Sequence, residues 1–171
     1  DPPKSFSRPV KLPEGEKDAA FRTVTVRPGV FPGGRVYFCE HHTPELVWRP
    51  EWQSHGNGAQ AIPEFVVASN EHAQEAKNFA KLLHSEVTGS GDSLGVAITD
   101  AQITVMTPTA YAARYGALAS PMAGRSSIFG ALVFRTDNLD KIRAAALNII
   151  DEANRVVVRV PEYDTVLEFV E

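Results

Sequence analysis

The sequence predicts an α+β fold built on a repeated βαβββ unit, and three observations carry this prediction. Residues 61–69 form an apolar strand pattern that ends at helix-capping residues, and an amphipathic segment, 71–84, follows. Short strand-like runs separated by Gly and Asp come next. The pattern that starts at Val66 then returns at Val133, with little identity between the two copies. We therefore expect two βαβββ modules.

The first module is predicted between residues 57 and 106. In its helical segment, Ala76, Phe79 and Leu83 fall on one face, which is the periodicity of a helix packed against a sheet. Acidic residues lie in the first turns of this segment and basic residues lie at its end, as the helix dipole favours. The three runs that follow, up to residue 106, complete the unit.

The second module is predicted between residues 128 and 171. Residues 128–136 read as a strand, and Asp137 or Asn138 is a capping residue for a helix over 139–153. Two β-branched runs close the chain as strands. The apolar face of the expected helix consists of Leu139, Ile142, Ala146, Ile149 and Ile150.

The chain begins with a different pattern. Four of its twelve prolines lie in the first twenty residues, which favours an extended arm or linker. Residues 19–28 and 35–43 then read as two strands of a hairpin, without a helix of their own. The predicted organisation is an arm at 1–18, the trailing strands of an incomplete first module at 19–56, a βαβββ module at 57–106, a helical and loop spacer at 107–127 and a second βαβββ-like module at 128–171.

Composition excludes several classes of partner. A net charge of −4 and a pI near 5.7 give no basic footprint for nucleic acid. The single cysteine, Cys39, excludes an internal disulfide or a thiolate-rich zinc site and favours a reducing compartment. The sequence contains no run of 18 apolar residues and no signal-like start, so we expect a cytoplasmic protein without a membrane partner.

The stretch "VYFCEHHTPELVWRPEWQSHGNGA", residues 36–59, resembles the segment that marks the glyoxalase-like domain family of the vicinal oxygen chelate superfamily. This resemblance implies paired modules that form a cupped mixed sheet around a site. It further implies lyase, isomerase or dioxygenase chemistry on a divalent metal such as Zn, Ni, Mn or Fe, or metal-free sequestration of a small molecule. Such proteins usually begin with a further module, which a longer protein, a second chain or a homodimer would supply.

The resemblance also indicates where metal ligands would lie, on the first and last strands of each module. The first-strand positions fall on Glu64 and near Ala131, and the last-strand positions fall on Thr104 and Glu168. Only the two glutamates can bind a metal. Glu64 is therefore a candidate catalytic residue and Glu168 a candidate metal ligand, although both also fit rim positions without a function.

Strand alternation divides the reactive residues near position 40 into two pairs. Glu40 and His42 share one face, and Cys39 and His41 share the other. Glu40 and His42 can act as a catalytic acid–base pair, and His42 with His55 can form a metal half-site. The opposite register is equally compatible with the pattern, and a strand histidine is more often structural.

Three further residues are candidates for substrate binding: Trp48, Arg114 and Tyr115. In a cupped sheet the spacer can lie over the mouth, where Arg114 would meet an anionic substrate. The alternatives are an aromatic core or interface for Trp48 and a solvated surface for Arg114. The sequence thus predicts a glyoxalase-like protein that binds a small oxygenated metabolite. A metal-free binding module and a structural half that pairs with another chain are the alternatives.

Overall fold

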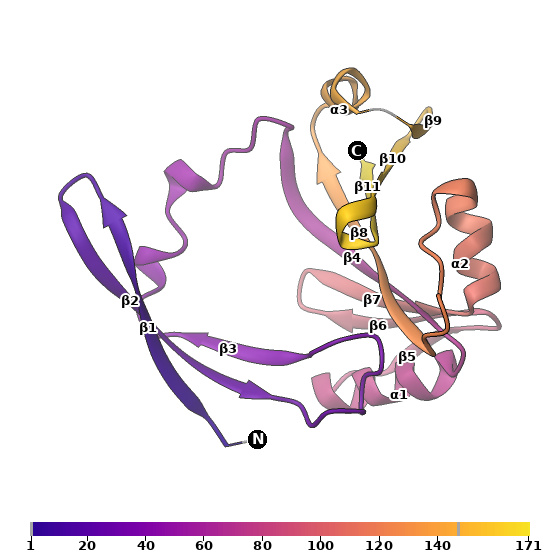
Figure 1. Cartoon of the computed structure of the whole chain (residues 1–171), viewed down its shortest axis with the longest axis horizontal. Helices are drawn as coiled ribbons and strands as arrows, with labels where there is room; N and C mark the ends of the chain where they lie inside the picture. The colour runs from indigo at the N-terminus through magenta and orange to yellow at the C-terminus, as the bar shows by residue number, and fades with distance from the viewer. Residues whose placement is uncertain (1, 147) are drawn as a thin grey trace. The chain divides into compact units, whose positions relative to one another are not determined.

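The computed structural model describes residues 2–146 and 148–171, which form two compact units. The first unit runs to Val30 and includes Arg35–Ser54, and the second comprises Phe31–Gly34 and His55–Glu171. Figure 1 shows the elements of both.

The first unit is a three-stranded antiparallel sheet in the order β1-β2-β3. Its strands are β1 (Lys4–Leu12), β2 (Gly15–Thr25) and β3 (Tyr37–His41), followed by the 3₁₀ turns η1 (Pro44–Leu46) and η2 (Pro50–Trp52). The segment predicted as an arm or linker is therefore a β-hairpin from Lys4 onward; residue 1 lies outside the described residues. Proline is compatible with this because Pro9 lies on an edge strand and Pro13 in the turn.

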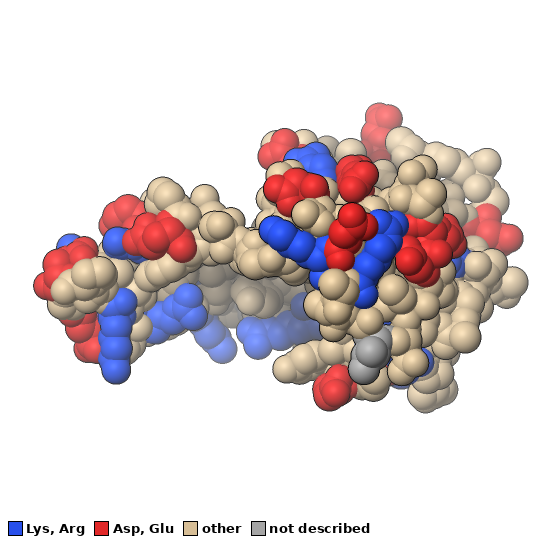
Figure 2. Space-filling model, turned by 90° about the horizontal axis from the view of Figure 1, so that it is seen from above, with Lys and Arg blue, Asp and Glu red and all other residues tan. Residues whose placement is uncertain are grey.

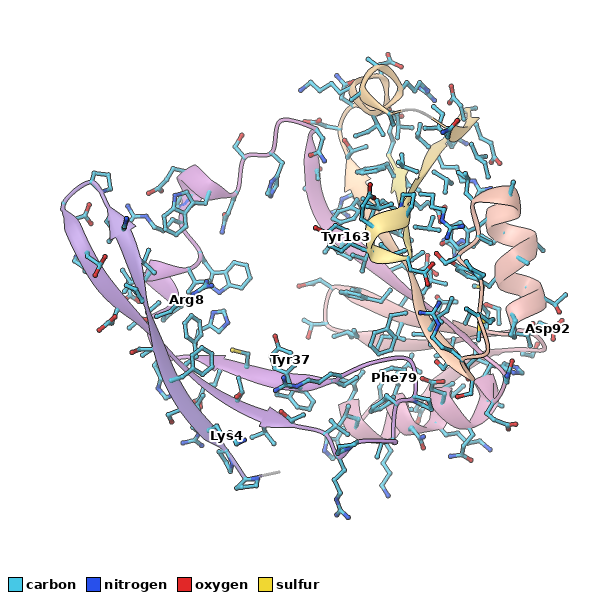
Figure 3. All side chains as sticks on the ribbon, viewed as in Figure 1. Lys4, Arg8, Tyr37, Phe79, Asp92 and Tyr163 are labelled. Atoms are coloured by element: carbon cyan, nitrogen blue, oxygen red, sulfur yellow. The ribbon has the colours of Figure 1, made fainter. Side chains whose placement is uncertain are left out.

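A small core holds this sheet together. Leu12, Ala19 and Phe21 pack against Leu46 of η1, and the backbone N–H of Ala20 donates to the Thr43 hydroxyl at 2.9 Å. Arg8 lies over the Phe21 ring, 5.4 Å from its centroid (Figure 3). Strand β3 is exposed along most of its length.

The second unit is built on one eight-stranded sheet in the order β5-β6-β7-β4-β8-β11-β10-β9. Parallel pairs join β4 to β7 and β8 to β11, and the antiparallel pair of β4 and β8 joins the two modules. The α+β fold with paired βαβββ modules is thereby confirmed. The elements are β4 (Ala59–Ser69), α1 (His72–Leu83), β5 (Val87–Ser90), β6 (Ser93–Ile98), β7 (Ala101–Met106), α2 (Pro108–Tyr115), η3 (Gly116–Leu118), β8 (Ser127–Thr136), α3 (Leu139–Ala145), β9 (Ile149–Glu152), β10 (Arg155–Val160), η4 (Pro161–Tyr163) and β11 (Thr165–Val170).

The two faces of this sheet carry different helices (Figure 1). On β11, Val166 packs in the cluster beneath α2, whereas Phe169 packs with α3 on the opposite face. Helix α1 buries Phe79, whose ring stacks on that of Phe31 at 4.2 Å. The spacer helix α2 thus occupies the face on which Glu64 and Glu168 lie.

The helix predicted over 139–153 is wrong in its length. Helix α3 ends at Ala145, and Ile149–Glu152 form the edge strand β9, which pairs antiparallel with β10; residue 147 lies outside the described residues. The two isoleucines fit either period, and pairing with β10 decides between them because β-branched residues pack well on a pleated surface.

Charged side chains of both signs lie next to one another on the face that Figure 2 draws. Among the described residues, no helix is both long and apolar enough to cross a membrane.

Candidate functional site

Four residues form one row across the central strands of the second unit. Glu64 on β4 pairs with Gln102 on β7 and with Val133 on β8, and Val133 pairs with Glu168 on β11. The predicted partners Ala131 and Thr104 are in a different row, where both pair with Val66. Alignment of the two modules on their helices misses this offset because β4 and β8 run antiparallel, which places Glu64 and Ala131 on opposite sides of the Phe65–Leu132 pair.

Helix α2 begins at a side-chain cap and is held over this row by a contact of Tyr111 with β8. Thr107 caps its first turn, accepting from the N–H of Ala110 at 3.1 Å, and Pro108 follows at a position where proline is favoured. The hydroxyl of buried Tyr111 donates to the carbonyl of Gly130 at 2.9 Å. A Cβ on Gly130 would lie 2.6 Å from the Tyr111 ring, so only glycine allows this approach.

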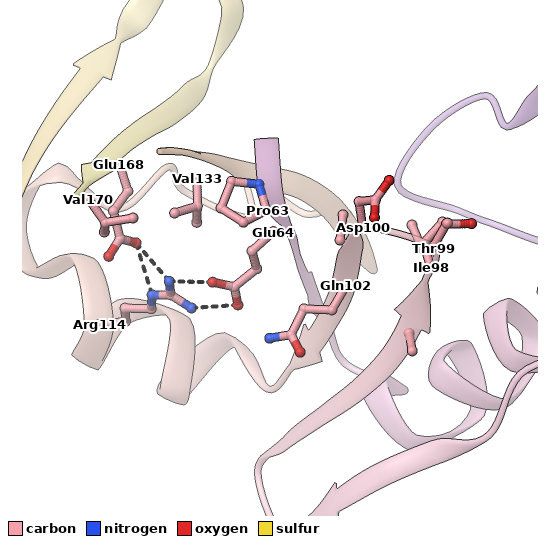
Figure 4. Close-up of a pocket in the computed structure, with 12 residues that line it drawn as sticks. Pro63, Glu64, Ile98, Thr99, Asp100, Gln102, Arg114, Val133, Glu168 and Val170 are labelled. Carbon is pink, nitrogen blue, oxygen red and sulfur yellow. Dashed lines mark hydrogen bonds and ion pairs between the residues drawn. The ribbon is translucent and has the colours of Figure 1, made fainter. Parts of the chain in front are cut away.

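This position directs the Arg114 guanidinium between the two glutamates (Figure 4). Nη1 and Nη2 donate to the two carboxylate oxygens of Glu64 at 2.9 and 2.8 Å, a bidentate pair. Nε and Nη2 donate to Oε2 of Glu168 at 3.1 and 2.8 Å. One cation thus bridges two carboxylates from different modules, an arrangement that we call the Arg114 bridge.

Two further side chains complete the surroundings of Glu168, which is 3% exposed. The hydroxyl of Tyr115 donates to Oε2 at 2.9 Å, and Arg155 approaches Oε1 at 3.4 Å. Arg155 is itself paired with Glu152 at 2.8 Å. Every carboxylate oxygen of the bridge therefore has a charged or hydroxyl donor, which buried carboxylates require.

The pKa shifts follow from burial and from these contacts. Burial alone would raise the pKa of Glu64, but hydrogen bonds from Arg114 and Thr104 outweigh it, so this pKa is lowered. Burial would lower the pKa of Arg114, and the hydrogen bonds to Glu64 again prevail and raise it. Burial raises the pKa of Tyr115. At neutral pH Glu64 is therefore a carboxylate, Arg114 a guanidinium and Tyr115 a neutral phenol.

A pocket of about 560 Å³ opens beside the Arg114 bridge. Its size is that of small-molecule sites in other proteins. The turn between β6 and β7, with Thr99 and Asp100 at its tip, forms one wall (Figure 4). The lining residues are Pro63, Glu64, Ala97, Ile98, Thr99, Asp100, Ala101, Gln102, Arg114, Val133, Glu168 and Val170.

The donor set of the row does not fit a resident metal. Gln102 and Val133 occupy the two positions between and beside the glutamates, and the Arg114 guanidinium already lies between the two carboxylates. Over residues 2–146 and 148–171, no group of three or more His, Cys, Asp or Glu side chains is placed to hold a metal ion. The predicted divalent metal stays a prediction, without support from these ligands.

The other predicted site residues lie outside this pocket. Glu40 and His42 do share one face, with His42 Nε2 3.5 Å from Glu40 Oε2, but both side chains are about half exposed in the first unit. Trp48, 63% exposed, stacks on His41. His55 is exposed in the loop before β4. Their predicted catalytic, substrate and metal roles stay predictions.

Gln102, Asp100 and Arg155 are the site residues that sequence reasoning missed. Gln102 had a detectable signal, since alternation along β7 places it on the same face as Thr104. Asp100 lies at a turn tip and Arg155 at a strand start, where charged residues are common and carry no signal.

Comparison with known proteins identifies the fold. No protein-family model and no curated protein matches the sequence. A hypothetical protein from Staphylococcus aureus is similar in structure, with a TM-score of 0.65 and 7% identity over 99% of this chain and 55% of that one. The chain thus spans about half the length of that protein. Methylmalonyl-CoA epimerase from Mycobacterium tuberculosis is similar with a TM-score of 0.50 and 15% identity, over 69% of this chain and 91% of the epimerase. The second unit's module order and these likenesses show a fold of the vicinal oxygen chelate type.

Proposed function

We propose that the protein binds a small organic molecule in the pocket beside the Arg114 bridge, and that this binding needs no metal ion. The observation that carries the proposal is the bridge itself, in which a guanidinium of the chain lies between the two carboxylates of the row. The adjoining pocket has both polar and apolar walls, as ligand sites usually have.

The bridge supports a metal-independent site on electrostatic grounds. Two carboxylates brought together at the centre of a sheet repel each other and require a cation. Arg114 provides that cation with two hydrogen bonds to each glutamate, so a metal ion would have to displace it. The rigid fork of a guanidinium suits this double bridge better than the point charge of a lysine.

The same geometry favours binding over proton abstraction by Glu64. A general base works best when its pKa lies near the operating pH. The pKa of Glu64 is lowered, and both of its oxygens accept hydrogen bonds from Arg114. Glu64 is therefore a weak base in this state, and lyase, isomerase or dioxygenase activity stays a prediction of the family resemblance.

A ligand screen by two-dimensional NMR of the full chain tests the proposal. We expect compounds from a polar fragment library to shift the backbone amides of Ala97–Gln102 equally with and without EDTA. Protein purified without chelator should hold less than about a tenth of an equivalent of any divalent metal, well below the one ion of an occupied metal site. Binding that EDTA abolishes would contradict the proposal.

Metal content of the same preparation also tests the alternative that the protein is a metalloenzyme. If a full equivalent of metal is present, His42→Ala should remove it and His72→Ala should not, because His72 is engaged with the carbonyl of Gly91 at 3.0 Å. Loss of metal in the His42 variant alone would replace the proposed function with the metal-dependent one.

A further inference from the structure

We infer that the ligand of this pocket carries a protonated nitrogen, as in a primary amine with a short apolar body. This inference rests on the proposed function and adds the chemical class of the ligand. It depends on which polar atoms of the pocket remain available once the Arg114 bridge has formed.

The only guanidinium among the lining residues is already engaged. Arg114 uses Nε and both protons of Nη2 on the two glutamates, and one proton of Nη1 on Glu64. An anionic ligand would have to compete with two carboxylates that hold this cation at 2.8 to 3.1 Å. This guanidinium therefore has only one N–H group, on Nη1, left for an anion.

The groups that remain are mostly acceptors. Gln102 donates its amide nitrogen to the Thr104 hydroxyl at 3.1 Å, which leaves its carbonyl oxygen for a ligand. Asp100 is exposed at the tip of the turn, and among the residues that the structure describes its carboxylate has no hydrogen-bond or ion-pair partner. Glu64 remains 14% exposed beside Gln102. A ligand that satisfies these oxygens must be a donor.

The charges of the lining residues favour the same class. Glu64, Asp100 and Glu168 are the acidic lining residues and Arg114 is the basic one, so the lining is net negative. Arg155, which also approaches Glu168, lies outside the lining and is paired with Glu152. A net negative cleft concentrates cations from solution and repels anions. Pro63, Ile98, Val133 and Val170 supply apolar surface for the body of the ligand (Figure 4).

Three probes of matched shape test the inference: phenethylammonium, 3-phenylpropionate and 2-phenylethanol. Each is titrated into the full chain at low salt, and affinity is read from the amide shifts of Ala97–Gln102. We expect the ammonium compound to bind about fivefold or more tightly than the alcohol, and the carboxylate to bind most weakly. Raising the salt concentration should weaken only the ammonium compound.

Asp100→Asn locates the effect and Asp140→Asn is the matched control, because Asp140 is 89% exposed on α3 and does not line the pocket. Asp100→Asn should weaken ammonium binding about two- to fivefold, as for loss of one exposed charge pair, and the control should not. Equal binding of ammonium and alcohol, tighter binding of the carboxylate, or an Asp100 variant with unchanged affinity would overturn the inference and leave the proposed function standing. Absence of pocket shifts with all three probes would contradict both.

Discussion

Replacing Arg114 by Met should destabilise the second unit strongly. The substitution keeps an unbranched apolar stem and removes the guanidinium with its charge. It leaves Glu64 and Glu168 facing each other across the row without the cation that holds both. Removal of one partner from a buried ion pair costs about 3–5 kcal/mol, chiefly because the remaining charge stays buried and unpaired.

The contacts of Arg114 indicate that the cost of its substitution falls within that range. Four donor–acceptor contacts of 2.8 to 3.1 Å disappear together. Charge-assisted bonds contribute about 1.5–3 kcal/mol each when counted alone, but bonds of one network do not add. Protonation of one glutamate and the retained bond from Tyr115 to Glu168 limit the loss. We therefore expect about 3–5 kcal/mol in the free energy of unfolding.

Urea unfolding followed by far-UV circular dichroism measures this change. Two variants keep the experiment interpretable if the single one unfolds. Arg114→Met combined with Glu64→Gln and Glu168→Gln removes all three charges and should recover most of the loss. Arg125→Met removes a cation of the same spacer that is 44% exposed, and it should cost no more than about 1 kcal/mol.

A loss below about 1 kcal/mol for Arg114→Met, equal to that of the Arg125 control, would contradict a buried ion pair at this position. The bridge would then be a surface-like pair that water replaces without cost. A triple variant less stable than Arg114→Met would also refute the reasoning, because charge removal could not then relieve the repulsion.

Three other measurements examine the same region. Gly130→Ala should lower the free energy of unfolding in urea by about 1–3 kcal/mol, because its Cβ would meet the Tyr111 ring at 2.6 Å. The control is Gly56→Ala, which has open space around its Cβ; Gly91→Ala is unsuitable because Gly91 has a positive φ. Tyr111→Phe should cost about 1–3 kcal/mol in the same assay, because the Gly130 carbonyl loses its 2.9 Å donor. The lowered pKa of Glu64 means that its carboxylate stabilises the fold above its usual value of 4.5 and that this stabilisation is lost as the pH falls through the folded-state pKa. The melting temperature should therefore fall less steeply below pH 4.5 in Glu64→Gln than in the unchanged protein, and equal slopes would contradict the shift.

The modular order of the second unit could be predicted from the sequence because each module contains strong local signals. Helix α1, His72–Leu83, begins and ends within one residue of the expected segment, 71–84. Strand β4, Ala59–Ser69, contains the apolar run predicted as a strand over 61–69. The sequence pattern over 139–153 predicted one helix and missed strand β9, because Ile149 and Ile150 suit either a helix or an edge strand. Pairing with β10, a tertiary contact, decides that segment.

The sequence identified several residues of the site as candidates, but it did not predict that they contact one another. Glu64, Arg114 and Glu168 were each candidates, and fifty or more residues separate Arg114 from either glutamate. Their meeting depends on the pairing of β4 with β8 and of β8 with β11, and on the close approach of Tyr111 to Gly130. A ladder register that contains bulges leaves no periodic signal in the sequence.

The spacer, together with the paired modules, determines which polar groups of this pocket are already engaged. Sheet register alone brings Glu64 and Glu168 to one row. Two such carboxylates would attract a cation from solution if none were supplied. Helix α2 supplies one that is covalently attached, and the contact of Tyr111 with Gly130 fixes its position. The state of the two carboxylates in the pocket therefore depends on eight residues, Pro108–Tyr115, that lie outside both repeated units.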